Sequence, residues 1–272
     1  MPTQYEIGII GSGNAAEGIV HGILRNSVLF DDRIVASDPN LDRRQLFERR
    51  FHVKTTNDNR FLVSQSYILL LAVKPQSFRD CVREFANLVR EDHLIVSIMA
   101  GISTRTIEEQ FPHIKARVVR VMPNLASHVG AGMAGVVPGR YASDADLLRA
   151  QRIFDAGGKS IHIGDEALMD AVTAVSGSGP AYYYFFTEAI IEGAKRVGLP
   201  PQVAALLARQ TALGAAHMML ESGDPPDVLR EKVTSPAGTT AAALAKMREL
   251  KLFEAIVEGI VAAFERSREL GK

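Results

Sequence analysis

The chain has 272 residues, of which 47% are hydrophobic and 23% charged, as in an ordinary soluble globular protein large enough for two domains. Its 31 basic and 31 acidic side chains leave no net charge, so we do not expect general binding to nucleic acid or to an anionic membrane. The one cysteine, Cys81, excludes an internal disulfide and fits a cytoplasmic protein. We find no signal peptide, no apolar run long enough to span a membrane, and no histidine or cysteine spacing typical of a metal site.

The first two-thirds of the sequence alternates short apolar runs with helical patterns. The runs predict strands over Tyr5–Ile10, Ile34–Ser37, Ile68–Val73, Leu94–Ile98 and Arg117–Met122. Helices such as Asn14–Arg25 and Arg43–Arg50 are predicted between them. Strands that are apolar on both faces and separated by helices predict an α/β domain with a doubly wound parallel sheet.

After about Gly164 the pattern becomes helical. It predicts helices from about Ser178 to Val197, from Pro201 to Glu221, from Pro226 to Lys232, and from Gly238 nearly to the C-terminus. We therefore expect a dinucleotide-binding sheet domain over residues 1–163 and an all-helical domain over residues 164–272.

The helix predicted over residues 201–221 is apolar around most of its circumference. Such a helix needs burial on every side, which one small helical domain can hardly supply. We therefore predict an interlocked homodimer through the helical domain. The alternative is a well-buried central helix in a monomer.

A glycine-rich turn, Gly11-Ser12-Gly13-Asn14-Ala15-Ala16, follows the first strand and opens the first helix. Its backbone N–H groups and the helix N-terminus are suited to a pyrophosphate, with Gly11 for the tight turn and Gly13 for close approach. The position after a strand favours dinucleotide binding over a purely structural turn.

The second strand ends at Ser37 and Asp38. An acid at this place binds the adenine ribose hydroxyls and favours NADH, whereas Ser37, Arg43 and Arg44 could neutralise the 2′-phosphate of NADPH. Asp38 is also consistent with a simple turn cap. The cofactor preference therefore stays open.

Three further strands end in segments that the doubly wound fold would place beside the ligand. They are Leu71–Pro75, Ser97–Gly101 and Val121–Asn124. Lys74 is equally consistent with a ligand contact and a solvated charge, and Pro75 with the start of a helix.

Small residues and hydroxyls gather between Val233 and Thr240, directly before the last predicted helix. Free N–H groups at a helix start can hold a carboxylate, and the hydroxyls of Thr239 and Thr240 can serve a second polar group. The alternative is an ordinary threonine N-cap.

Five strings occur in a characteristic order: Gly11-Ser-Gly-Asn14, Ala72-Val-Lys-Pro75, Val121-Met-Pro-Asn124, Ser176-Gly-Ser-Gly-Pro-Ala-Tyr182 and Thr234-Ser-Pro-Ala-Gly-Thr-Thr240. With them the chain resembles pyrroline-5-carboxylate reductase over essentially its whole length. The resemblance implies an N-terminal Rossmann-type domain, an all-α C-terminal dimerisation domain and, in many members, a ring of five dimers. It also implies reduction of Δ1-pyrroline-5-carboxylate to L-proline by NADPH or NADH.

The resemblance assigns site residues position by position. Its cofactor-binding segments match Ile10, Gly11, Ser12, Gly13, Asn14, Ala15, Ser37, Asn59, Ala72, Val73, Lys74, Pro75, Ile98, Met99 and Ala100, beside which Asp38 is our own candidate. Its substrate region matches Glu166, Gly238, Thr239 and Thr240, with Ser235 in the same loop. No metal is implied.

Four places depart from the family pattern. Ala15 replaces a usual Met, Leu125-Ala126 a usual Thr-Pro, and Ala237-Gly238 a usual Gly-Gly; Lys232 stands where a polar uncharged residue can contact substrate. These departures leave room for a paralogue that acts on a related cyclic imine acid.

The implied reaction needs orientation more than acid–base groups, because a protonated imine is already an electrophile. We expect Thr240 to hydrogen-bond the ring nitrogen and to help proton delivery.

A β-hydroxyacid dehydrogenase would need a basic lysine near the start of the helix predicted over residues 178–197. The one lysine of this helix, Lys195, lies near its far end. A non-catalytic dinucleotide sensor would not need the 234–240 loop. Both alternatives are disfavoured, and we expect the glycine turn and the threonine loop to meet across one cleft, within one chain or between subunits.

Overall fold

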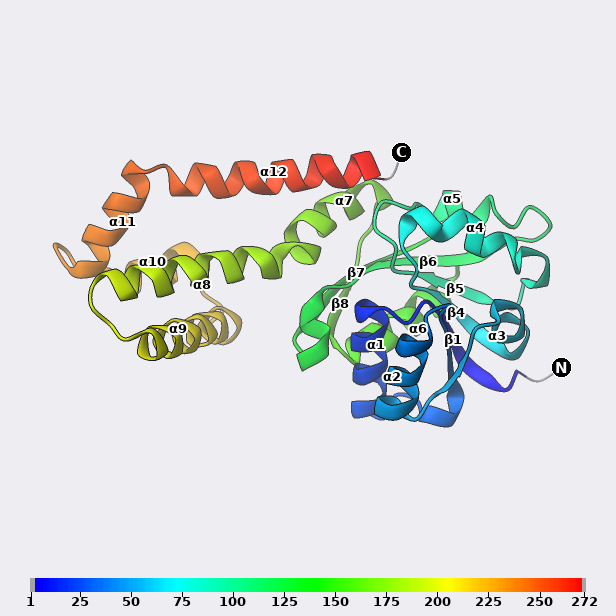
Figure 1. Cartoon of the computed structure of the whole chain (residues 1–272). Helices are drawn as coiled ribbons and strands as arrows, with labels where there is room; N and C mark the ends of the chain where they lie inside the picture. The colour runs from blue at the N-terminus through cyan, green and yellow to red at the C-terminus, as the bar shows by residue number, and fades with distance from the viewer. Residues whose placement is uncertain (1–2, 271–272) are drawn as a thin grey trace. The chain divides into compact units, whose positions relative to one another are not determined.

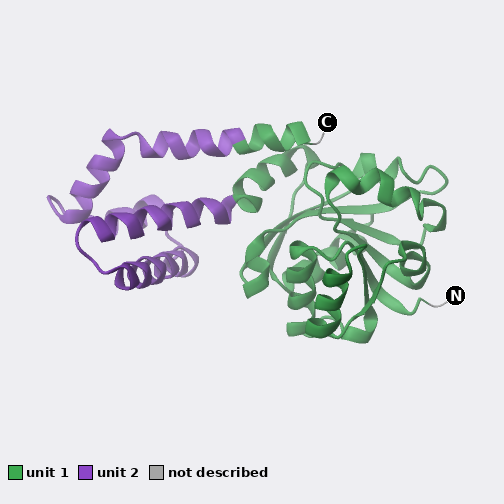
Figure 2. Ribbon diagram, in the orientation of Figure 1, with its two compact units in different colours: residues 1–178, 263–272 green, residues 179–262 purple. Residues whose placement is uncertain are grey.

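The computed structural model describes residues 3–270. The chain forms two compact units (Figure 2): the sheet unit, residues 1–178 with 263–272, and the helical unit, residues 179–262. The chain passes between the units twice, at residues 178 and 179 and again at residues 262 and 263. The domain boundary expected after residue 163 stays a prediction. The two compact units instead meet between residues 178 and 179.

The sheet unit contains one eight-stranded sheet (Figure 1). Its strands are β1 Tyr5–Ile10, β2 Ile34–Ser37, β3 Lys54–Thr56, β4 Ser66–Leu71, β5 Leu94–Ser97, β6 Arg117–Met122, β7 Gly132–Pro138 and β8 Gly158–His162. Their order is β3-β2-β1-β4-β5-β6-β7-β8, and every neighbouring pair is parallel except β6 with β7. The doubly wound, predominantly parallel sheet is confirmed.

Three strands, β3, β7 and β8, were not predicted, and β7 pairs antiparallel with β6. Strand β7 contains Gly132, Gly135 and Pro138, residues that weaken a strand signal. Strand β8 lies at the sheet edge and is largely exposed, so it lacks an apolar run. Strand β3 has only three residues.

Helices cover both faces of this sheet (Figure 1). They are α1 Asn14–Arg25, α2 Leu41–Phe51, α3 Asn59–Gln65, α4 Phe78–Arg83, α5 Thr104–Glu108, α6 Asp144–Asp155 and α7 Met169–Val172, with short turns η1 Asp31–Arg33, η2 Pro75–Ser77, η3 Ala86–Leu88, η4 Leu125–Val129, η5 Glu166–Leu168 and the π-helical η6 Thr173–Gly177. Alternate strand residues enter different core clusters: Ile68 and Leu70 pack with α1, α2 and α6, whereas Leu69 and Leu71 pack with α3, α4 and α5. Both faces are therefore buried, as the apolar strands predict.

The helical unit contains α8 Gly179–Arg196, α9 Pro201–Glu221, α10 Pro226–Lys232, α11 Thr239–Glu249 and most of α12 Leu252–Leu270. The predicted helices are confirmed with one correction. The last stretch is two helices rather than one, because Lys251 adopts a left-handed φ of 55° between α11 and α12. Periodicity alone does not reveal such a break, since apolar residues continue on both sides of it.

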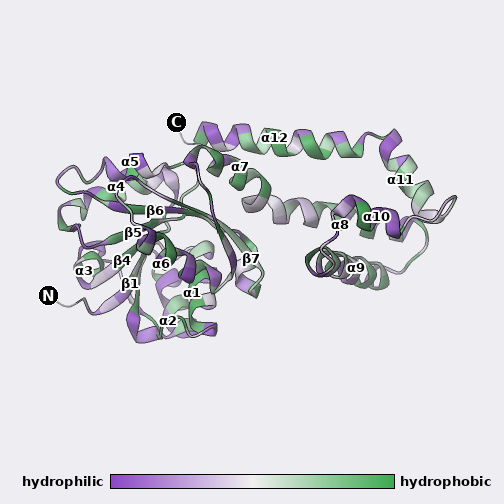
Figure 3. Ribbon diagram, turned by 180° about the vertical axis from the view of Figure 1, so that it is seen from behind, coloured by the Kyte–Doolittle hydropathy of each residue, from purple (hydrophilic) through white to green (hydrophobic). Residues whose placement is uncertain are grey.

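Helix α9 is exposed in the single chain. Only Ala204 and Ala208 are buried, whereas Leu206 and Leu220 are 64% and 77% exposed. The alternative of a well-buried central helix in a monomer is therefore wrong. Figure 3 shows hydrophobic residues along α9 and α12. By length and composition α9 is the one helix within residues 3–270 that could cross a membrane, which is weak evidence by itself.

Candidate functional site

The predicted cofactor residues converge at the carboxyl ends of β1, β2, β4 and β5. The strand order reverses between β1 and β4, and open α/β sheets bind ligands at this kind of switch point. Backbone hydrogen bonds join the neighbouring strand ends: Gly11 N to Ser37 O at 2.8 Å, Ala72 N to Ile10 O at 2.8 Å, and Ile98 N to Leu71 O at 3.1 Å. Strand ends that lie far apart in the sequence are therefore neighbours at the carboxyl edge of the sheet.

Gly11 makes the turn that the sequence predicts. Its φ is +97°, a conformation that side chains with a Cβ rarely adopt. A Cβ there would lie 2.7 Å from the carbonyl oxygen of Ala72. Glycine is therefore required both by the backbone angle and by the close passage of the β4 end.

The start of α1 is open towards a ligand. Its N-cap, Gly13, makes no side-chain capping bond, and a Cβ built on Gly13 would meet no atom within 4 Å. Beside it, Ser12 is 1% exposed and its buried Oγ has no hydrogen-bond partner. Uncapped N–H groups, a glycine without packing demands and an orphaned hydroxyl fit a bound pyrophosphate.

Asp38 holds the glycine turn. Its Oδ2 accepts from the Ser12 N–H at 2.8 Å, and its Oδ1 accepts from the Asn40 N–H at 2.9 Å. The role of Asp38 as a turn cap is thus seen directly. Its contact with the adenine ribose stays a prediction.

The arginines after β2 make internal contacts. Arg43 donates to Ser12 O at 2.6 Å and to Glu17 Oε2 at 2.9 Å, and Arg50 also pairs with Glu17. Arg44 donates to the backbone oxygen of Asp38 at 2.6 Å. The two residues that could meet a 2′-phosphate therefore support the turn, and their contact with a cofactor stays a prediction.

Ser37 and Asn59 form a second polar group at this edge. The Ser37 hydroxyl donates to Asn59 Oδ1 at 2.6 Å, and Asn59 Nδ2 donates to Glu84 Oε2 at 2.7 Å. Asn59 also lies 3.7 Å from Cys81 Sγ. Burial, together with the charge of Glu84, raises the pKa of the Cys81 thiol to about 11, so the thiol stays protonated at neutral pH.

The remaining cofactor candidates follow β4 and β5. Pro75 begins the short helix η2, which agrees with its interpretation as a helix start. Lys74 is the N-cap of η2, and its side chain makes no capping hydrogen bond. Met99 is 2% exposed, and its N–H donates to Ser97 Oγ at 3.3 Å. Met99 thus anchors the segment that follows β5.

Glu166 lies in the sheet unit and is held by protein groups. Its carboxylate accepts from Thr104 N at 2.8 Å and Thr104 Oγ1 at 2.5 Å, and it pairs with Arg120 at 3.2 Å. Its role towards substrate stays a prediction. Sequence reasoning missed Arg120 and Thr104, although an arginine inside an apolar strand is a signal for a buried ion pair.

The threonine loop lies in the helical unit. Gly238 is the N-cap of α11 and makes no side-chain capping bond, so Thr239 and Thr240 are the first residues of the helix. The alternative of an ordinary threonine N-cap is therefore wrong. The uncapped N–H groups of the first turn fit the expected carboxylate. Because this loop and the glycine turn belong to different units, their meeting in one cleft stays a prediction.

Two departures from the family pattern have visible consequences here. Ala237 adopts a left-handed φ of 56°, which costs about 1–2 kcal/mol in a residue that has a Cβ. A glycine would avoid this strain. Lys232 Nζ lies 2.5 Å from Asp224 Oδ2, so its charge is paired within the helical unit.

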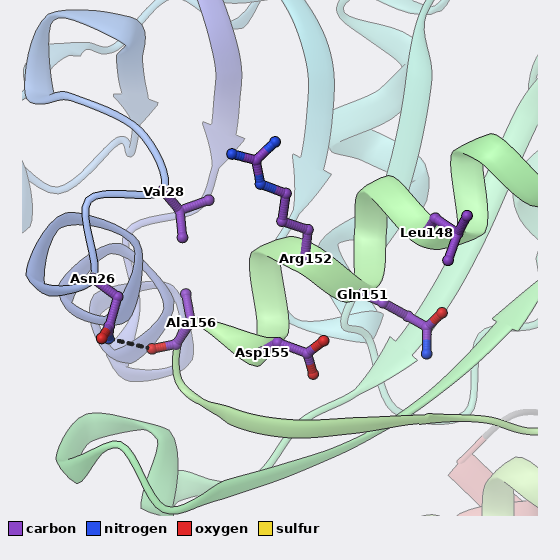
Figure 4. Close-up of a pocket in the computed structure, with 7 residues that line it drawn as sticks. All are labelled: Asn26, Val28, Leu148, Gln151, Arg152, Asp155 and Ala156. Carbon is purple, nitrogen blue, oxygen red and sulfur yellow. Dashed lines mark hydrogen bonds between the residues drawn. The ribbon is translucent and has the colours of Figure 1, made fainter.

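A hollow of about 590 Å³ lies elsewhere, against α1 and α6 (Figure 4). Its lining residues are Asn26, Val28, Leu148, Gln151, Arg152, Asp155 and Ala156. None of them belongs to the predicted site.

Comparison with known proteins matches both halves of the chain. Residues 166–270 match the family described as pyrroline-5-carboxylate reductase dimerisation, and residues 6–101 match NADP oxidoreductase coenzyme F420-dependent. The chain is 38% identical to the pyrroline-5-carboxylate reductase of Methanosarcina acetivorans over 269 residues, 99% of each chain. It is 39% identical to that of Pisum sativum over 268 residues, 98% of this chain and 96% of the other. The chain belongs to the pyrroline-5-carboxylate reductase family.

Solved structures agree with this assignment. A pyrroline-5-carboxylate reductase from Coxiella burnetii has a TM-score of 0.90 at 35% identity, covering 99% of this chain and all of that one. The Plasmodium falciparum enzyme with NADP bound has a TM-score of 0.89 at 25% identity, covering all of both chains. The predicted family and the fold class, a Rossmann-type sheet with a helical dimerisation region, are confirmed. A prephenate dehydrogenase from Aquifex aeolicus, at 14% identity and a TM-score of 0.56, shares the fold alone.

Proposed function

We propose that this chain reduces Δ1-pyrroline-5-carboxylate to L-proline, the last step of proline biosynthesis, with NADPH or NADH as the reductant. One observation carries the proposal: the open glycine turn at the switch point of the sheet, in a chain that aligns from end to end with pyrroline-5-carboxylate reductases.

The glycine turn and the ends of β2, β4 and β5 would hold the cofactor. The N–H groups at the start of α1 face the pyrophosphate, and Ser12 supplies a buried hydroxyl. Ser37, Asp38 and Asn59 would face the adenine ribose, since they lie at the β2 end of the sheet or beside it. When bound, the reduced nicotinamide supplies a hydride for the imine carbon.

The 235–240 loop would hold the substrate. The uncapped N–H groups of α11 orient the carboxylate, with Ser235 and Gly238 shaping the backbone around it. The Thr240 hydroxyl hydrogen-bonds the ring nitrogen and relays to it a proton taken from solvent, which with the hydride completes the secondary amine. Glu166, in the sheet unit, stays a predicted substrate-binding residue.

A reductase of a related cyclic imine acid is the second candidate, favoured by Lys232 and Ala237 in place of the family's usual residues. Purified protein with NADPH or NADH and five- or six-membered imine acids, followed by the absorbance of the reduced cofactor, separates the candidates. Fastest turnover of the five-membered acid supports the proposal, and fastest turnover of the six-membered acid supports the second candidate. Cofactor binding without turnover would identify a sensor.

Thr240→Ala tests the proposed proton delivery. We expect kcat/KM to fall by about 10²-fold, the scale of a positioned proton-transfer group. Thr240→Ser keeps the hydroxyl and should retain most of the activity. An unchanged kcat/KM in the alanine variant would remove Thr240 from the mechanism.

The chain would work in the cytoplasm as a homodimer, and five such dimers would form a ring. The exposed apolar faces of α9 and α12 support self-association. We expect neither nucleic acid nor a membrane as a partner. Sedimentation of the purified protein distinguishes a dimer from a decamer.

A further inference from the structure

The helices that follow β1 and β2 differ in what their first turns offer to a ligand. Helices α1 and α2 lie side by side (Figure 1). The start of α1 has no side-chain cap. At the start of α2, by contrast, Asn40 Oδ1 accepts from the N–H groups of Asp42 at 2.8 Å and Arg43 at 3.4 Å. The first turn of α1 can therefore receive an anion, whereas that of α2 already holds a side chain of the protein.

The turn that joins β2 to α2 uses its own backbone donors. The Asp38 N–H donates to Thr56 O at 3.3 Å, and the Asn40 N–H donates to Asp38 Oδ1 at 2.9 Å. Between these two residues, Pro39 has no N–H. A phosphate beside residues 38–40 would therefore find no free backbone N–H in this turn.

Ser37 and Asn59, at the same end of β2, also direct their donors towards other protein groups. The Ser37 hydroxyl donates to Asn59 Oδ1 at 2.6 Å. Asn59 Nδ2 donates to Glu84 Oε2 at 2.7 Å and lies 3.7 Å from Cys81 Sγ. The hydroxyl and the amide that could bind a phosphate are therefore engaged within the sheet unit.

The two arginines at this edge are engaged as well. Arg43 donates from Nε to Ser12 O at 2.6 Å and from Nη2 to Glu17 Oε2 at 2.9 Å. An arginine binds a phosphate best through two parallel N–H groups, and Nε with Nη2 is such a pair. Arg44 donates from Nη1 to the backbone oxygen of Asp38 at 2.6 Å.

Asp38 supplies acceptors where the donors are engaged. Its two carboxylate oxygens each accept one hydrogen bond from the backbone, from the Ser12 N–H at 2.8 Å and the Asn40 N–H at 2.9 Å. A carboxylate can accept about four hydrogen bonds, so Asp38 can still accept from a ligand. The 2′-hydroxyl of NADH donates such a bond, whereas the 2′-phosphate of NADPH brings negative charge and acceptor oxygens.

We propose that Asp38, Asn40 and Arg43 make this site selective for NADH over NADPH. Asp38 accepts from the adenine ribose hydroxyls and repels a 2′-phosphate, while the first turn of α2 and the paired N–H groups of Arg43 keep their donors within the protein. All of these residues belong to the sheet unit. The inference rests on the proposed function, because it names the preferred reductant of the same site.

Titration of the purified protein with NADH and with NADPH, in the absence of an imine acid, measures the preference. The fluorescence of the reduced nicotinamide reports binding. We expect the Kd for NADPH to be about tenfold or more above the Kd for NADH, because like charges would be brought together at Asp38. Equal affinities, or tighter binding of NADPH, would overturn the proposal.

Asp38→Asn tests the residue that carries the preference. Asparagine removes the charge, adds an amide donor and keeps an oxygen for the Ser12 N–H. We expect the ratio of the NADPH Kd to the NADH Kd to fall by about tenfold or more. Asp32→Asn is the matched control, since it removes the same charge just before the opposite end of β2. An equal fall in both variants would overturn the role of Asp38.

Asn40→Gly is the second variant, and it leaves Asp38 in place. Glycine removes the cap of α2 with little loss of helix stability. The freed N–H groups should lower the Kd for NADPH by about threefold and leave that for NADH unchanged. Ser143→Gly is its control, because Ser143 caps α6, away from the predicted site. An unchanged Kd for NADPH in Asn40→Gly would overturn the role of the cap.

Binding and turnover separate this inference from the proposed function. Tighter binding of NADH without reduction of any imine acid would refute the reductase assignment and leave the preference standing. Turnover by a protein that binds NADPH more tightly than NADH would overturn the preference and leave the reductase assignment intact.

Discussion

Several polar side chains of the sheet unit are buried at the opposite edge from the predicted site, and His93 is the clearest case. It is 1% exposed just before β5, and its Nδ1 accepts from the Arg90 N–H at 3.0 Å. Burial, with the nearby charges of Arg90 and Arg117, lowers the pKa of His93 to about 4, and Asp92 opposes this only in part. The folded protein therefore keeps His93 neutral well into the acidic range.

This burial makes stability depend on pH. A histidine in the unfolded chain binds a proton near its ordinary pKa of 6.5, whereas His93 in the folded chain does so only near 4. The contribution of His93 to the free energy of unfolding is therefore fully present above pH 6.5. It falls by about 3 kcal/mol as the pH drops towards 4. In His93→Asn, which keeps an acceptor for Arg90 without titrating, urea unfolding should show a smaller loss over this range. An equal loss in both proteins would contradict the prediction.

At the scale of elements, the β1–α1 connection combines two glycines with different duties. Gly11 is needed by the fold, because of its φ and its distance to Ala72. Gly13 has an ordinary φ of −72° and no atom near a Cβ position, so the fold does not require it. We propose that Gly13 instead lets a cofactor phosphate approach the backbone.

Replacing each glycine by alanine separates these duties. Gly11→Ala should lower the free energy of unfolding by about 2 kcal/mol or more, because it adds backbone strain and a steric clash. Gly13→Ala should leave unfolding nearly unchanged and still weaken cofactor binding. Urea unfolding and fluorescence titration with NADPH measure the two effects. A Gly13→Ala protein with wild-type affinity would show that no phosphate passes close to this residue.

At the scale of the whole molecule, helix α9 exposes an apolar side that a second protein surface could bury. Leu206, Leu213 and Leu220 follow one another at seven-residue steps and are 64%, 52% and 77% exposed in the single chain. This spacing places them on one helix face. Each fully buried leucine contributes roughly 1.5–3 kcal/mol, so covering the stripe favours association strongly.

Charges on this stripe should prevent self-association. We expect the double variant Leu206→Glu and Leu213→Glu to sediment as a smaller species than the wild type and to melt at a lower temperature. Leu148→Glu is the control, because Leu148 is 66% exposed but lies on α6 of the sheet unit. A double variant of unchanged mass would show that the stripe is not the interface.

The sequence by itself determined the local elements and the chemistry of their ends. Apolar runs located five strands, the spacing around Gly11 predicted a dinucleotide-binding turn, and the composition of α9 indicated that a single chain could not bury it. These features are local, because periodicity, turn residues and helix composition act within one turn or strand. Strands β7 and β8 were not predicted, because the glycines and proline of β7 and the exposure of β8 remove the apolar pattern of a strand.

Only the tertiary structure decided which polar side chains meet. Asp38, after β2, accepts a hydrogen bond from Ser12, after β1. Arg120 lies beside Asp170, and Asp170 accepts a hydrogen bond from Ser267 near the end of the chain. Such pairings follow from which strands become neighbours and where the chain returns, and no short-range pattern encodes either. The buried ion pair of Arg120 with Glu166 therefore became visible only once β6 and the 166–178 segment were packed together.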